Sequence, residues 1–184
     1  MAVAPPLIRR LAWPTAAALA LLFVVGLALT GERPDAGIAQ FKASGLLTAF
    51  APDDTHEVEI AVGGKTWRFR REDVWHAVEA PAKVAPDVGG RIDAALRLLR
   101  NAGPLRVLTA DEVAQMPESE YALSAQSLLV RLHGPNGAMF QVRFGGRNPL
   151  GSARYSRVMG VEGLPMLPTY VSEAWEQVIG EGER

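Results

Sequence analysis

The chain has 184 residues, of which 48% are hydrophobic and 21% are charged, and it contains no cysteine. Nineteen Lys and Arg against twenty Asp and Glu give a formal net charge of −1, which excludes a strongly basic nucleic-acid binder. Without cysteine the chain has no disulfide, cysteine metal site or thiol catalysis, and its length suits one domain with an attachment.

The first part of the chain is apolar. Arg9 and Arg10 precede a run without any charged residue from position 11 to position 30. At about 1.5 Å per residue, a helix over its first nineteen residues spans roughly 28 Å, close to the hydrocarbon thickness of a bilayer. We therefore expect a single transmembrane anchor over residues 11–30. Its principal side chains are Leu11, Trp13, Leu19, Leu22, Phe23, Val24 and Leu27.

The two arginines predict the orientation, because positively charged flanks stay on the cytoplasmic side of a membrane. Residues 1–10 would be cytoplasmic, 31–45 a linker, 46–180 a periplasmic domain and 181–184 a tail, at a bacterial inner membrane. A cleaved signal peptide is the alternative, because Gly26-Leu27-Ala28 suits a signal peptidase, although the apolar run is long for that role. A soluble helix that is apolar on every face would need a larger protein around it.

Alternating apolar and polar residues predict an antiparallel meander at the start of the domain. Residues 56–62 and 65–70 each alternate, which is typical of half-buried strands. Gly63-Gly64 between them indicates a hairpin turn. A third short strand would run through Trp75 towards Glu79.

The segment 88–102 has the pattern of the main amphipathic helix. Asp87 is the expected N-cap, and Gly103 followed by a proline ends the helix. Asp93 and Arg97 have the spacing of a helical ion pair. The apolar stripe consists of Val88, Ile92, Ala95, Leu96 and Leu99.

The remaining elements complete an α+β domain. Thr109 and Glu112 have the spacing of a capping box before a short helix, and Gly134-Pro135-Asn136-Gly137 indicates a second hairpin. The expected strands cover 105–108, 127–133, 138–144 and 153–159, with a loop over 145–152 and a final helix near 171–178. The predicted architecture is a mostly antiparallel sheet in two strand groups. The main helix and the short helices would cover one face of it.

No constellation in the sequence argues for a catalytic, cofactor-binding or metal-binding residue. His56, His76 and His133 fall on three different expected strands, without the spacing of metal ligands. No serine lies in a G-x-S-x-G context. The glycine-rich segment 145–151 joins two strands and opens no helix, so we expect a glycine-dependent turn and no phosphate-binding loop.

Basic residues gather around this segment. A local basic patch is suited to an acidic partner surface or a carboxylate ligand. The alternative interpretation is a solvated sheet face without a partner. The candidate contact residues are Arg143, Arg147, Asn148, Arg154 and Arg157.

Turn motifs and aromatic residues over about residues 46–178 occur in an order similar to one known family. They are Trp67, Trp75, Pro81, Ala85-Pro86-Asp87, Ala110-Asp111, Tyr121-Ala122-Leu123, Phe144-Gly145-Gly146-Arg147-Asn148-Pro149-Leu150-Gly151 and Tyr155. In these the chain resembles the domain of unknown function 4340 family, which usually has Gly where Ala122 stands. The resemblance implies an exported or membrane-anchored domain, often encoded beside ABC-type transport or gliding-related genes, and offers no catalytic residue.

Together these observations predict a non-enzymatic single-pass membrane protein, an accessory or assembly subunit of a membrane-associated or periplasmic complex. Its expected partners are the bilayer, through residues 11–30, and a protein, without nucleic acid, metal or cofactor. The alternative is a periplasmic small-ligand binding or sensing domain, auxiliary to an ABC-type transport or gliding-related system. It would need a pocket between helix and sheet. An enzyme would need a cleft with mutually hydrogen-bonded acid, base or nucleophile, which the sequence does not bring together.

Overall fold

The computed structural model describes residues 17, 20–23, 25–26, 45–81, 84 and 86–180. The chain divides into two compact units, Met1–Lys42 and Ala43–Arg184. Among the described residues, no helix combines the length and the hydropathy needed to cross a membrane. Of the expected anchor residues, Leu22 and Phe23 are helical and exposed. The others, which lie outside the described residues, are Leu11, Trp13, Leu19, Val24 and Leu27.

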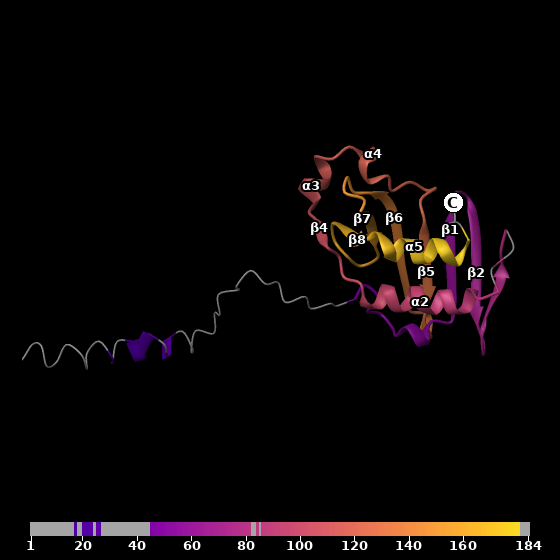
Figure 1. Ribbon diagram of the computed structural model, residues 1–184, viewed down its shortest axis with the longest axis horizontal. Helices are drawn as coiled ribbons and strands as arrows, with labels where there is room; N and C mark the ends of the chain where they lie inside the picture. Colours follow the sequence, from indigo (N-terminus) through magenta and orange to yellow (C-terminus); the bar gives the residue numbers. More distant parts are fainter. Residues whose placement is uncertain are drawn as a thin grey trace, which may run out of the picture. The chain divides into compact units, whose positions relative to one another are not determined.

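An antiparallel sheet forms the frame of the second unit (Figure 1). In the described part of the chain it has eight strands in the order β3-β2-β1-β5-β6-β7-β8-β4. The strands are β1 (Glu57–Val62), β2 (Lys65–Arg71), β3 (Trp75–Glu79), β4 (Arg106–Leu108), β5 (Leu129–His133), β6 (Met139–Arg147), β7 (Ala153–Val158) and β8 (Leu164–Pro168). The α+β class is confirmed. The two predicted strand groups are halves of one continuous sheet, because β1 pairs with β5.

Helices α2 and α5 lie across one face of the sheet (Figure 1). The predicted stripe on α2 is buried in the same core as Trp67, Trp75 and Trp175. The helices of the unit are α2 (Val88–Asn101), α3 (Ala110–Ala114), α4 (Glu118–Tyr121) and α5 (Thr169–Val178), with short 3₁₀ turns η1 (Pro52–Asp54) and η2 (Pro135–Gly137). This core positions the sheet, and with it the residues on the opposite face.

A second, smaller core lies on that opposite face. Tyr155 and Leu164 belong to it, together with partly buried residues of α3 and of the segment that contains α4. Leu167 lies three residues beyond Leu164 on β8 and belongs to the main core, so the two face opposite sides. The expectation that all helices cover one face is therefore wrong for α3 and α4.

The expected helix ends are only partly confirmed. Thr109 and Glu112 form the predicted capping box, in which the Glu112 N–H donates to Thr109 Oγ1 (3.3 Å) and the Thr109 N–H to Glu112 Oε2 (2.8 Å). Asp87 occupies the N-cap position of α2, but its side chain makes no capping bond and accepts from Arg91 Nε at 3.0 Å.

The predicted Asp93–Arg97 pair does not form. The carboxylate of Asp93 accepts instead from Arg71 and from Trp75 Nε1, the latter at 2.9 Å. This contact joins α2 to β2 and β3. Helical spacing could not predict it, because its partners lie 22 and 18 positions away in the sequence.

Strand β6 extends three residues further than expected, through the two glycines to Arg147. Gly145 and Gly146 belong to it, at an irregularity in its pairing with β7, and the loop begins at Asn148. A Cβ on Gly145 would lie 2.0 Å from the Tyr121 carbonyl oxygen, and one on Gly146 would lie 2.8 Å from that of Glu120. The glycines are required because the backbone of α4 lies directly on the strand.

The described part of the second unit starts by docking on the last turn of α2. The Leu46 N–H donates to the Ala102 carbonyl (3.2 Å), and the Leu47 N–H donates to that of Leu99 (3.4 Å). Arg100 Nη1 donates in return to the Leu47 carbonyl at 2.6 Å. Two of the carbonyls at the C-terminal end of the helix, those of Leu99 and Ala102, are thereby satisfied by the chain that enters the domain.

Candidate functional site

The candidate patch is divided by the structure, because two of its arginines bind helix α5. Arg147 Nη2 lies 3.0 Å from Glu173 Oε1, and Arg154 Nη1 lies 2.7 Å from Glu176 Oε1. Both glutamates belong to α5. These two guanidiniums hold the helix on the β6–β7 hairpin, so their charge is compensated inside the domain.

Asn148 organises the loop between β6 and β7. Its Oδ1 accepts from the Ala153 N–H at 3.0 Å, and its backbone N–H donates to the Ala153 carbonyl at 2.8 Å. Gly151 has φ +71° and donates its N–H to the Asn148 carbonyl at 2.8 Å. Asn148 is thus a structural residue of a glycine-dependent turn, at whose tip Leu150 is 86% exposed.

Arg143 and Arg157 remain on the face opposite α2 and α5, directly across from each other in the register of β6 and β7. Arg143 Nη1 donates to the Ser124 carbonyl at 2.9 Å, and Arg157 is exposed. Within the described part of the chain, neither guanidinium forms an ion pair, and Arg157 makes no hydrogen bond. The two guanidiniums thus occupy facing positions without a carboxylate within ion-pair distance, and like charges in such positions destabilise a sheet.

Two pockets that Arg157 lines lie between the sheet and the short helices, and Arg143 reaches the first of them through its hydrogen bond to the Ser124 carbonyl. One has a volume of about 480 Å³ and is lined by Glu118, Ser119, Tyr121, Leu123, Ser124 and Arg157, with Ala122. The other has a volume of about 320 Å³, is lined mostly by apolar residues of α3 and β8, and shares Tyr121 and Arg157 with the first. We call Arg143, Arg157 and these two pockets the arginine site.

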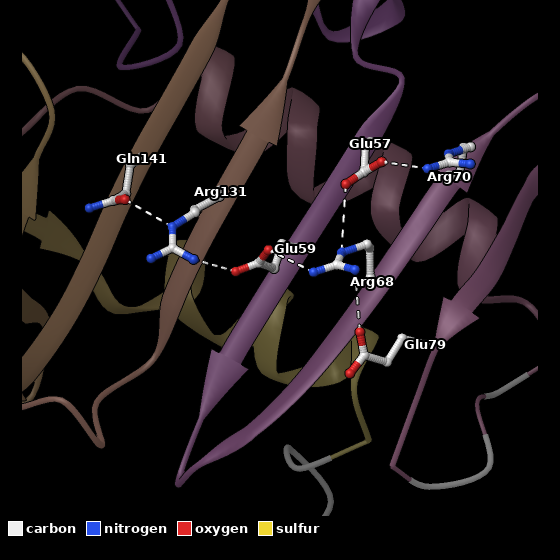
Figure 2. A network of polar contacts seen from close by, with 7 residues as sticks. All are labelled: Glu57, Glu59, Arg68, Arg70, Glu79, Arg131 and Gln141. Carbon is white, nitrogen blue, oxygen red and sulfur yellow. Dashed lines mark hydrogen bonds and ion pairs between the residues drawn. The ribbon is translucent and has the colours of Figure 1, made fainter.

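The rest of the same sheet face is charged but neutralised (Figure 2). A row of side chains crosses five strands in register, from Glu79 through Arg68, Glu59 and Arg131 to Gln141. Arg68 lies 3.4 Å from Glu79 and 3.5 Å from Glu59, and Arg131 contacts Glu59 and donates to Gln141 at 3.0 Å. Every charge in this row has an opposite charge beside it.

A second row beside it adds one more neutral pair. Arg70 Nη2 lies 3.1 Å from Glu57 Oε2, and Glu57 also lies 3.6 Å from Arg68 Nε. In Figure 2 these side chains stand on the face of the sheet turned away from the helices. The contrast between this neutral half and the arginine site is the main electrostatic feature of the face.

Tyr155 lies under α4 next to the arginine site. Its hydroxyl donates to Glu120 Oε1 at 3.4 Å. Burial, together with the neighbouring Glu120 carboxylate, raises the pKa of Tyr155 above the ordinary value of 10.0. The hydroxyl therefore stays protonated at neutral pH, where it is a hydrogen-bond donor and no base.

A third pocket, of about 400 Å³, lies at the opposite end of the sheet. Arg71 stacks 4.5 Å from the centre of the Trp75 ring and contacts Asp93, which also accepts from Trp75. These polar groups satisfy one another. Within the described residues, no group of three or more His, Asp or Glu side chains is arranged to hold a metal ion.

The basic patch predicted from the sequence includes Arg143 and Arg157 but not the residues that surround them in the structure. Tyr121, Glu120 and Ser124 come from a segment with a short, weak helical pattern, and only the tertiary fold lays it over β6 and β7. The only signal in the sequence was the Gly145-Gly146 pair, which the structure explains by the close approach of the α4 backbone.

No protein-family model, curated protein or solved structure matches this chain. The resemblance to the domain of unknown function 4340 family stays a prediction, and the function is inferred from the arginine site itself.

Proposed function

We propose that this protein is a non-enzymatic accessory or assembly subunit that binds a partner protein in a membrane-associated or periplasmic complex. The proposal includes a transmembrane anchor over residues 11–30 and an exported domain at a bacterial inner membrane, on the strength of the uncharged run and the preceding arginines. An anchor of this kind raises the effective concentration of the domain near membrane partners.

The single observation that carries the proposal is the facing pair Arg143 and Arg157, which has no ion-pair partner and of which Arg157 lines two open pockets. Elsewhere on the same face the sequence neutralises each arginine with a glutamate. A like-charge pair costs stability, and a partner that supplies negative charge gives a reason for keeping it.

A small-ligand binding domain is the second candidate. Its expected pocket between the main helix and the sheet has less support, because the apolar stripe of α2 is buried in one core with Trp67 and Trp75. The larger pocket of the arginine site, at about 480 Å³, has the size of a small-molecule site. If the domain binds a small ligand, the arginine site is therefore the place where we expect it to bind.

The test is affinity purification of the tagged full-length protein from native membranes in mild detergent, with mass spectrometry of the proteins that accompany it. The variant Arg143→Gln/Arg157→Gln removes the pair. The control Arg70→Gln/Arg97→Gln removes the same charge from two other exposed arginines. We expect a stoichiometric partner to accompany the wild type and the control. Its affinity for the Arg143→Gln/Arg157→Gln variant should fall about tenfold, equivalent to about 1.4 kcal/mol of binding free energy.

If the partner were retained equally by all three proteins, the accessory-subunit proposal would stand, but the partner would bind at a surface other than the arginine site. A protein recovered alone at low salt would contradict the proposal and favour the small-ligand candidate.

A further inference from the structure

The arginine site has a shape and charge that specify what its partner presents. Arg143 and Arg157 stand opposite each other on neighbouring strands, and one N–H of Arg143 is used by the Ser124 carbonyl. Each guanidinium has five N–H donors in a planar fork, so most of the donors of this pair are free. Planar forks of this kind match the two oxygens of a carboxylate.

Acidic residues lie near the pair but do not pair with it. Glu118 lines the larger pocket, and Glu120 lies beside Tyr155, but neither is within ion-pair distance of the two guanidiniums. A partner protein carries negative charge mainly on its Asp and Glu side chains, so a carboxylate is the anion that this pair meets in such a partner.

The smaller pocket adds an apolar requirement. Its volume is about 320 Å³, and Val113, Leu164 and the shared Tyr121 contribute to its walls. An apolar side chain placed there is removed from water, and burial of its surface stabilises the complex. A free carboxylate ion has no apolar side chain to bury and lacks this contribution. An occupant that fills both parts of the site carries a carboxylate and an apolar side chain a short distance apart.

We propose that the arginine site binds an extended segment of the partner protein, with one Asp or Glu carboxylate on Arg143 and Arg157 and an apolar side chain in the pocket beside Tyr121 and Leu164. This inference rests on the proposed function and names the chemistry of the partner's contact. Because a carboxylate and an apolar side chain share the binding, an isolated small carboxylate binds much more weakly.

The test uses a random dodecapeptide display library selected on the purified full-length protein in detergent. We expect the selected peptides to be enriched in Asp or Glu next to Leu, Ile, Val or Phe. Synthetic copies should bind at least tenfold more weakly to the Arg143→Gln/Arg157→Gln variant, and less than twofold more weakly to the Arg70→Gln/Arg97→Gln control. Replacing the acidic residue of the peptide by its amide, or the apolar residue by Ser, should each weaken binding severalfold.

Folding of the variant is checked separately. The variant should unfold cooperatively at a temperature close to that of the wild type, because removal of two like charges that face each other offsets the loss of the Arg143 bond to the Ser124 carbonyl. Selection of peptides without acidic residues, failure to select any, or equal binding by the variant would overturn the inference. Competition by inorganic phosphate as strong as that by the peptide would do so too. None of these outcomes bears on the co-purification experiment, which makes no assumption about the chemistry of the partner.

Discussion

Arg154 and Glu176 join strand β7 to helix α5 by an ion pair of 2.7 Å, and only 16% and 21% of the two side chains is exposed. The neighbouring pair, Arg147 and Glu173, connects the same hairpin to the same helix at 3.0 Å but is 50% and 43% exposed. The two pairs therefore connect the same elements at similar distances and differ in their exposure to solvent. This exposure decides how much the free energy of unfolding falls when one partner is removed.

Glu176→Gln is expected to lower the free energy of unfolding by about 1–3 kcal/mol, because it leaves a shielded guanidinium without its counter-charge. Glu173→Gln is expected to change it by no more than about 0.5 kcal/mol, because water screens an exposed pair. Urea unfolding of both variants provides the comparison. Equal effects of the two substitutions would contradict the assignment.

Gly45→Ala is expected to destabilise the domain by about 3 kcal/mol. A Cβ at this position would lie 1.2 Å from the carbonyl oxygen of Arg100, a backbone atom that cannot turn away as a flexible side chain can. Gly103→Ala is the control, because a Cβ there meets nothing within 4 Å. Thermal unfolding measures the difference, and a Gly45→Ala variant as stable as the control would show that the docking on α2 does not form.

Ala122→Gly is expected to stabilise the domain by about 1 kcal/mol. Ala122 ends α4 with φ 44° and ψ 42°, a left-handed conformation that costs an L-residue with a Cβ and suits glycine. The side chain is exposed, so its loss removes little contact. Ala125→Gly, also exposed but not at a positive φ, should be neutral or slightly destabilising. The opposite order of stabilities would refute this explanation.

Tyr155 is expected to make stability fall at alkaline pH. Its raised pKa means that the folded chain holds the phenolic proton more tightly than the unfolded chain. The contribution is fully present below pH 10.0 and is lost as the pH rises towards the higher pKa of the folded state. The unfolding free energy, measured on both sides of this range, should decline more steeply for the wild type than for Tyr155→Phe.

Tyr170→Phe, at a tyrosine that is 51% exposed, is the control for the loss of a phenolic hydroxyl as such. If Tyr155→Phe declines as steeply as the wild type, the hydroxyl of Tyr155 is not responsible.

Local signals in the sequence predicted the elements that local chemistry determines. Gly63 and Gly64 have φ +57° and +79° in the turn between β1 and β2, as a two-residue hairpin requires. Asn136 and Gly137, at φ +55° and +76°, also take left-handed conformations, in the longer connection between β5 and β6. The capping box at Thr109 is likewise an interaction between residues three apart.

Elements that depend on distant partners were missed. Strand β8 contains Pro165 and Pro168, which argue against a strand inside a sheet, yet it pairs with both β7 and β4. The division of the basic patch into paired and unpaired arginines could not be predicted from the sequence for the same reason. Glu173 and Glu176, three apart on one helix, neutralise two arginines that are more than twenty positions away in the sequence. Which arginines stay uncompensated is thus decided by the docking of α5.

The docking of the chain on α2 also has a mechanical consequence. Tension on the chain before Gly45 acts first on the backbone hydrogen bonds that Leu46 and Leu47 make to the last turn of α2. It reaches β1 only after these bonds have been peeled away, because Phe50 and η1 still separate them from the strand. Helix α2 therefore bears the force first. A pull on the N-terminal segment does not act on the sheet, or on the surface that the sheet presents, until the hydrogen bonds to α2 have broken.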